Sequence, residues 1–227
     1  MQPLKNIEQH NMKIKIKHLA IILSLLMLPE LFFSSCLKEG DDTIVLPTPI
    51  GKIPTTFIAQ NIQDSLRAHD MDIFEGYYPP VVEGLYLSAP MVLHYASDEY
   101  VNSFYDLYMR FSNQIPRGLI TYAESQNITT AGKSLEANII GQDSNFTMFC
   151  SQEISRDSAS IRLWTCKTAT VISGTITPAG IKNCKYTFIM LSKEADTEYH
   201  ASQLADVDTY RIYFDGDSLA TTQTMVL

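Results

Sequence analysis

Hydrophobic residues recur at two different spacings along the 227-residue chain. Over residues 55–75 the spacing is three or four, which predicts one amphipathic helix with a single apolar face. That face is formed by Ile58, Ile62, Leu66, His69 and Ile73. Further along, the spacing changes to two, as in Phe146, Met148 and Cys150, which is typical of half-buried antiparallel strands. The pattern therefore predicts a helix over 55–75 and an antiparallel β domain over 76–227.

Turn signals separate the predicted strands, among them Pro178-Ala179-Gly180 and Asp215-Gly216. Many short strands with frequent turns favour one all-β domain, either a closed barrel or a jelly-roll sandwich. The segment Gly84-Leu85-Tyr86, which opens the first strand, is similar to the opening motif of lipocalin-like barrels, where tryptophan takes the place of Tyr86. That resemblance implies a single antiparallel, lipocalin-like β-barrel, and the jelly-roll β-sandwich is the alternative.

The first 35 residues have the composition of an export signal. Lys13, Lys15 and Lys17 precede the apolar run Leu19–Leu28, and Ser34-Ser35 follows it. A transmembrane helix needs about 20 apolar residues, so this run is too short to span a bilayer. A basic start, a short apolar centre and small residues at the end predict a signal peptide over 1–35, with translation starting at Met12. The alternative is a buried helix that ends at a cysteine.

The sequence Phe33-Ser34-Ser35-Cys36 resembles the lipobox of bacterial lipoproteins. The resemblance implies that signal peptidase II cleaves before Cys36 once this cysteine carries diacylglycerol. Acyl chains such as palmitate would then anchor the protein to a lipid bilayer, its expected partner. Residues 36–54 would form a flexible tether, because Lys38–Asp42 is charged and three prolines keep the rest extended.

Four segments look like those of an uncharacterised group of Bacteroidetes outer-membrane lipoproteins. They are residues 79–86, 110–114, 172–177 and 214–219. This resemblance implies an outer-membrane location and a small β domain, but no known activity and no known catalytic residues. Lys38–Asp42 is similar to the acidic sorting stretches of surface-exposed members, so we expect the protein at the cell surface or on the periplasmic face of the outer membrane.

Three cysteines remain once Cys36 is lipidated. Segments 146–151 and 161–167 are predicted to be the arms of a hairpin, which would place Cys150 roughly opposite Cys166. We therefore predict a disulfide between Cys150 and Cys166, with Cys184 as a buried thiol. The alternative is three unpaired cysteines in the core, because free cysteine packs as a small hydrophobic residue.

No catalytic signature is found, since the chain lacks the nucleophile elbow, the P-loop and the H-E-x-x-H motif. His94 and His200 are isolated in the sequence. The acidic residues around 206–217 do not have the spacing of a calcium loop, and they are typical of a strand entry and an Asp-Gly turn. We therefore expect no catalytic residues, metal site or cofactor. A net charge of −8 also argues against a nucleic-acid partner.

Aromatic residues are the candidate binding groups. Tyr77 and Tyr78 lie beside two prolines, and Trp164 is the only tryptophan. Such side chains combine a flat apolar face with a polar tip, which suits a glycan, an amphiphile or a surface protein. The alternative is that they only fill strand positions, which aromatic residues favour. Separately, Asp42-Thr43 and Asp157-Ser158 look like the short O-glycosylation signal of Bacteroidetes exported proteins, which implies modification at Thr43 and Ser158.

These observations favour a membrane-anchored, non-enzymatic lipoprotein that binds a small amphiphile or a glycan at the cell envelope. One alternative is a structural or interaction subunit of a cell-surface assembly, and another is a hydrolase whose polar residues meet only in the fold. A hollow apolar interior would support the binding protein. An exposed aromatic patch would support the assembly subunit. A cleft with His94 or His200 beside a carboxylate would support the hydrolase.

Overall fold

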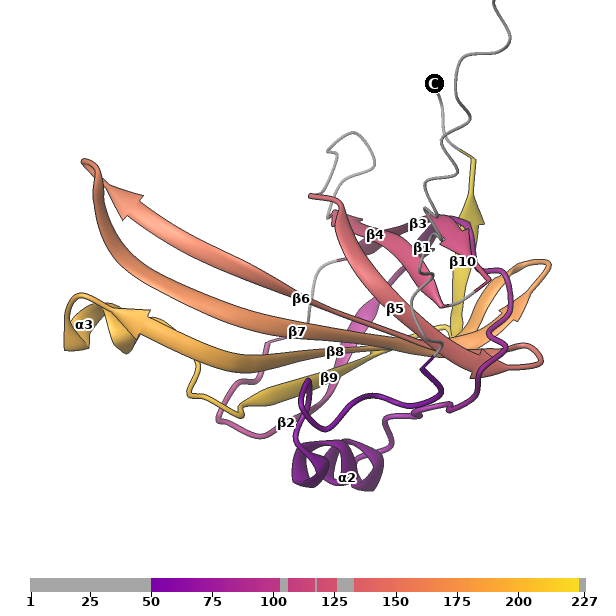
Figure 1. Ribbon diagram of the computed structural model, residues 1–227, viewed down its shortest axis with the longest axis horizontal. Helices are drawn as coiled ribbons and strands as arrows, with labels where there is room; N and C mark the ends of the chain where they lie inside the picture. Colours follow the sequence, from indigo (N-terminus) through magenta and orange to yellow (C-terminus); the bar gives the residue numbers. More distant parts are fainter. Residues whose placement is uncertain (1–49, 103–105, 117, 126–132, 225–227) are drawn as a thin grey trace, which may run out of the picture. The chain divides into compact units, whose positions relative to one another are not determined.

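The computed structural model describes residues 50–102, 106–116, 118–125 and 133–224, which all belong to one compact unit. In this part of the chain, ten strands and two short helices are present (Figure 1), and helix α2 (Gln60–Ala68) precedes the first strand. The predicted all-β class with one N-terminal helix is therefore confirmed. No helix of the described residues is long and apolar enough to cross a membrane. The predicted signal peptide, Cys36 and Thr43 lie outside the described residues.

All ten strands belong to one antiparallel sheet. They are β1 (Gly84–Ser88), β2 (Met91–Ala96), β3 (Leu107–Ile115), β4 (Leu119–Ser125), β5 (Leu135–Gln142), β6 (Asn145–Ser158), β7 (Ile161–Thr177), β8 (Gly180–Ala195), β9 (Tyr210–Asp215) and β10 (Leu219–Gln223). The order is β10-β1-β3-β4-β5-β6-β7-β8-β9-β2, and β10 also pairs with β8. This last pairing closes a ring of eight strands, whereas a jelly-roll sandwich would have two sheets.

The ring closes because strand β8 has two successive partners on one edge. Its first residues, Gly180–Lys182, pair with β10, and Lys185–Ile189 then pair with β9. Between these two stretches Asn183 has a positive φ of 51°, and its backbone N–H donates to Ser218 O at 2.8 Å. The edge of β8 therefore continues from the ring into the pair β9–β2 without losing its hydrogen bonds.

Strands β6, β7 and β8 are much longer than their neighbours, with 14, 17 and 16 residues. Strand β5 pairs with β6 only as far as Phe149, so the rest of β6 runs beyond the ring. Figure 1 shows these three strands extending together as a ribbon to one side, with helix α3 (Glu198–Ala201) near the end of β8. We call this part the β6–β8 ribbon.

The sheet has a hydrophobic core on each of its two faces. Inside the ring, the alternating residues Phe146, Met148 and Cys150 of β6 belong to one core. On the outer face, Phe149 packs with residues of α2, including Ile62 and Leu66, in a second core. Over these residues β6 is therefore buried on both faces, and not half-buried as its period-two pattern predicted, because its side chains point alternately into the two cores.

Helix α2 is shorter than the predicted span of 55–75. Residues before it form a turn, in which the N–H groups of Phe57 and Ile58 both donate to Pro54 O. The helix ends before Asp70, whose φ of +62° is incompatible with a continuing α-helix. Apolar periodicity therefore located the helix, but it could not detect these two breaks, because turn residues can keep the same apolar spacing.

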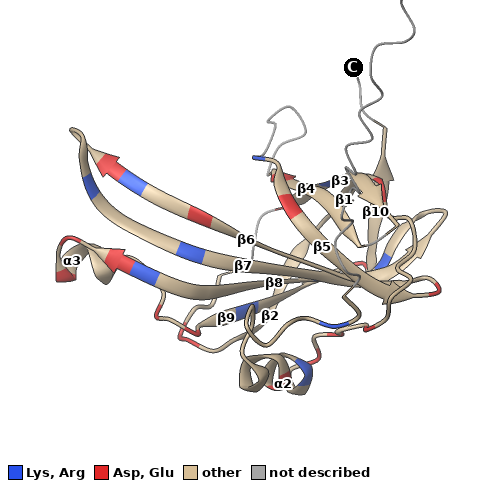
Figure 2. Ribbon diagram, viewed as in Figure 1, with Lys and Arg blue, Asp and Glu red and all other residues tan. Residues whose placement is uncertain are grey.

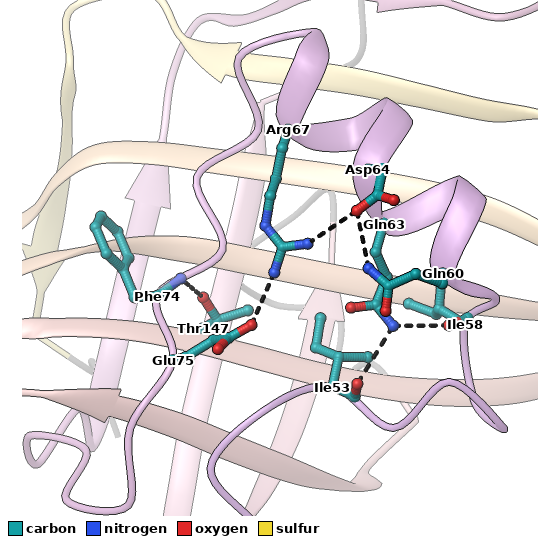
Figure 3. A network of polar contacts seen from close by, with 9 residues as sticks. All are labelled: Ile53, Ile58, Gln60, Gln63, Asp64, Arg67, Phe74, Glu75 and Thr147. Atoms are coloured by element: carbon teal, nitrogen blue, oxygen red, sulfur yellow. Dashed lines mark hydrogen bonds and ion pairs between the residues drawn. The ribbon is translucent and has the colours of Figure 1, made fainter.

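The end of the predicted tether is part of the folded unit. Ile53 is only 1% exposed and packs in the core beneath α2, which corrects the expectation of a flexible segment as far as residue 54. The buried Gln63 side chain donates to Ile53 O and Ile58 O at 3.2 and 2.7 Å (Figure 3). A single glutamine thus fixes the chain before the helix, because its amide satisfies two buried carbonyls.

The structure contradicts the predicted disulfide between Cys150 and Cys166. The prediction of this disulfide assumed a hairpin turn near residues 156–158, whereas the chain turns at Ala159 and Ser160, both with positive φ. Cys150 therefore lies opposite Thr170, and Cys166 lies opposite Ile154. Four residues along a strand correspond to about 13 Å, too far for a disulfide. Cys150, Cys166 and Cys184 are all free and buried, which is the alternative stated above.

Candidate functional site

A groove of about 460 Å³ lies where the β6–β8 ribbon leaves the ring. Its strand residues continue the inner face of the ring, because Cys166 and Thr168 follow the alternation that places Ile172 in the ring core. The lining consists of Tyr100, Ile154, Trp164, Cys166, Thr168, Phe188, Met190, Gln203, Leu204, Ala205 and Arg211. The groove is therefore the open continuation of the inner core.

The inner end of the groove is a stack of aromatic rings around one guanidinium. The guanidinium carbon of Arg211 lies 3.8 Å from the ring centre of Tyr100 and 5.8 Å from that of Phe188. Its Nη2 donates to Asp98 Oδ2 at 2.6 Å, and this bond lowers the pKa of the Asp98 carboxyl. Stacking and ion pairing together hold Arg211 in place, so this end of the groove is preorganised.

Trp164 forms part of the outer end of the groove. Its indole Nε1 is buried and has no hydrogen-bond partner among the described residues. A buried N–H without an acceptor is unfavourable by about 1–3 kcal/mol. A ligand with an acceptor at this position would remove that penalty, so Trp164 is a candidate binding residue on structural as well as sequence grounds.

One wall of the groove is the segment between α3 and β9, represented by Gln203, Leu204 and Ala205. The segment is fixed at both ends. At its start, the Gln203 N–H donates to His200 O of α3 at 3.3 Å. Near its end, Lys193 Nζ lies 2.7 Å from Asp206 Oδ1. These contacts hold in place the segment that forms this wall of the groove.

A buried polar cluster crosses the ring interior. The Tyr122 hydroxyl on β4 donates to Glu124 Oε2 at 2.6 Å, and Tyr186 on β8 also bonds this carboxylate. Burial raises the pKa of Glu124. Glu124 was not among the predicted site residues, although its alternation with Ile120 and Tyr122 on β4 was the signal that could have placed it inside the ring.

The aromatic residues predicted from the sequence are not brought together. Tyr77 and Tyr78 are 60% and 81% exposed, and Tyr78 lines a separate hollow of about 320 Å³ with Gln114 and Ile115. Trp164 lines the groove. Ser158 is exposed at the end of β6, where glycosylation stays a prediction.

Both isolated histidines lie beside carboxylates. His94 Nε2 is 3.3 Å from Asp70 Oδ2, and His200 Nδ1 contacts Asp196. Neither histidine lines the groove or the two smaller hollows of the described residues. His200 belongs to the cap of α3, and His94 stacks on Phe214 with ring centres 4.0 Å apart. No group of three metal-ligating side chains is found within the described ranges.

Asp215 is a buried carboxylate at the end of β9. The Ser88 hydroxyl donates to its Oδ2 at 2.5 Å, and Asp217 is its acidic neighbour. Burial, together with Asp217, raises the pKa of Asp215 to about 6. The folded protein therefore binds a proton here more tightly than the unfolded chain does. The contribution of this proton to the free energy of unfolding is therefore fully present below pH about 4, and it is lost as the pH rises through 6.

Asp215→Asn is expected to stabilise the protein at pH 8, because it removes the buried charge and leaves an amide that can donate to Asp217. A shift of two pKa units corresponds to about 3 kcal/mol, and the lost acceptor reduces the expected gain to about 1–2 kcal/mol. At pH 4 the two proteins should differ little. Urea unfolding at both pH values measures this, with exposed Asp143→Asn as a control, and a gain that is equal at both values would contradict the assignment.

Comparisons of the chain with protein-family models, with curated proteins and with solved structures find no match.

Proposed function

We propose that this protein is a lipid-anchored, non-enzymatic protein of the cell envelope whose β domain binds a small amphiphile in the groove. The groove itself is the observation that carries the proposal. Its volume of about 460 Å³ lies within the usual range of about 300–1,000 Å³ for small-molecule sites. Its lining combines apolar side chains with a few polar groups, as such sites do.

Anchoring at Cys36 is the part of the proposal that depends on the sequence. The lipobox-like segment 33–36 and the likeness to Bacteroidetes lipoproteins support attachment to the outer membrane, at the cell surface or on its periplasmic face. An acidic protein gains little from anionic head groups, so acyl chains on Cys36 have to supply the attachment.

Binding without catalysis is supported by the side chains that line the groove. They include no carboxylate and no histidine among the described residues. The nucleophile present is Cys166, and burial raises the pKa of its thiol, which disfavours the reactive thiolate. The hydrolase alternative needs a base in the cleft, and His94 and His200 lie elsewhere.

A second candidate function, a subunit of a surface assembly, has its own supporting observation. Tyr77, Tyr78 and Val81 are 60%, 81% and 72% exposed and follow one another closely in the chain. Neighbouring exposed apolar side chains of this kind are common at protein–protein contacts. This surface is separate from the groove, so the two functions can be tested independently.

The binding function is tested by titrating the lipidated full-length protein in phosphatidylcholine vesicles with sodium decanoate. Because Trp164 is the only tryptophan, its emission reports on the groove directly. We expect a saturable blue shift after correction for partition into empty vesicles. Leu204→Asp places a charge in the groove and should weaken binding at least tenfold, whereas Val207→Asp, outside the lining, should not. A titration that never saturates would refute the proposal.

A further inference from the structure

We propose that the ligand of the groove is a linear amphiphile with a carboxylate head group, which Trp164 and Arg156 hold at the outer end. Its hydrocarbon chain then runs along the ribbon towards the ring. This inference rests on the proposed function, because it concerns the same groove. It goes further by choosing one ligand class and by assigning a binding role to Arg156, which does not line the groove itself.

The head-group site consists of two neighbouring donors. Arg156 on β6 lies directly opposite Trp164 on β7 in the antiparallel ladder, so both side chains project from the same face. Arg156 is exposed, and its side chain has no ion pair or hydrogen bond with any residue in the described ranges. The Trp164 Nε1 is buried and equally without a partner there. A free guanidinium beside an orphan N–H matches a carboxylate, which offers several acceptor sites and no donor.

Two other basic residues near the outer end of the ribbon are paired and Lys167 lies on the opposite face of β7, which singles out Arg156. Figure 2 shows basic and acidic residues along the outer parts of β6, β7 and β8. Arg162 bonds Asp157, and Lys193 pairs with Asp206 at 2.7 Å. An anion at the outer end of the groove would therefore meet the guanidinium of Arg156, which has no ion-pair partner among the described residues.

An apolar track leads from this end towards the ring. Ile154, Met190 and Phe188 line the groove in turn, and Leu204 faces them from the α3–β9 segment. Thr170 lies opposite Phe188, and the six residue-to-residue steps of β7 from Trp164 to Thr170 span about 20 Å. Such a length suits an extended hydrocarbon chain better than a compact ring.

The polar balance of the lining argues against a sugar. Each hydroxyl of a glycan is a donor that needs an acceptor when it is buried. The described lining has only the Tyr100 and Thr168 hydroxyls and the Gln203 amide as side-chain oxygen acceptors, and it has no carboxylate. A carboxylate amphiphile donates nothing, so it avoids this penalty.

The test compares sodium decanoate, decan-1-ol and octyl glucoside in the vesicle titration of Trp164 emission. We expect decanoate to bind at least tenfold more tightly than decan-1-ol. Arg156→Glu should weaken decanoate binding at least tenfold and leave decan-1-ol unchanged, and Arg156→Lys should keep most of the affinity. Lys167→Glu makes the same charge change on the opposite face of β7 and is the matched control.

The outcomes separate this inference from the function on which it rests. Equal binding of decanoate and decan-1-ol, with no effect of Arg156→Glu, would overturn the carboxylate head group but keep a groove that binds amphiphiles. Tighter binding of octyl glucoside would overturn the inference in favour of a glycan. If none of the three gives a saturable change, both the inference and the proposed function fail.

Discussion

Cys36→Ser is expected to abolish lipid attachment, since oxygen cannot replace the sulfur that accepts diacylglycerol. In palmitate-labelling experiments the variant should carry no label. In detergent phase separation, its distribution between the detergent phase and the aqueous phase should differ from that of the parent protein. Because signal peptidase II acts only on the lipidated cysteine, the precursor should also keep residues 1–35 and migrate more slowly. This is an all-or-none effect, and it tests the anchoring part of the proposed function.

Cys166→Ser is the control for this experiment. Cys166 is buried in the β domain, so its replacement should leave palmitate labelling unchanged. If the Cys36→Ser protein still incorporates palmitate, or matures to the same size as the parent protein, then residues 33–36 are not a lipobox. The groove would still exist in that case, because its described lining residues, from Tyr100 to Arg211, belong to the β domain.

Local pattern predicted the strands and the helix, but not the register. Alternation of Phe146, Met148 and Cys150 identified the inner face of β6, since strand side chains point to opposite faces in turn. The predicted disulfide failed because the turn lies at Ala159 and Ser160, two residues with positive φ. Neither residue is a glycine or an asparagine, which are the usual signals for such a turn. The position of the hairpin turn could therefore not be predicted from the residue types.

The candidate site was accessible to sequence reasoning only in part. Trp164 could be singled out as the only tryptophan, with a polar tip in a predicted strand. Its neighbours could not, because Tyr100, Phe188 and Arg211 come from distant segments and meet only after β8 pairs with both β7 and β9. Arg156 can be recognised as a candidate binding residue only once the strand register places it opposite Trp164.

Gly180→Ala is expected to be among the most destabilising single methyl additions in the ring. Gly180 has a φ of +143°, which non-glycine residues rarely adopt, and a Cβ there would lie 2.1 Å from the backbone oxygen of Ala220. That oxygen belongs to β10, so the clash falls on the pairing that closes the ring. The backbone of β10 cannot move aside as a flexible side chain can. We therefore expect the free energy of unfolding to fall by about 3–5 kcal/mol.

Ala159→Gly is the opposite test in the same chain. Ala159 has a φ of +48° in the β6–β7 turn, where glycine relieves strain, so this variant should be as stable as the parent or more stable. Urea unfolding measures both variants. In Gly180→Ala the decanoate response should also weaken, because β8 carries Gly180 at the ring closure and Phe188 and Met190 in the groove. A Gly180→Ala protein within 1 kcal/mol of the parent would mean that β10 can move away from β8 at little cost, and that the closure does not hold the groove together.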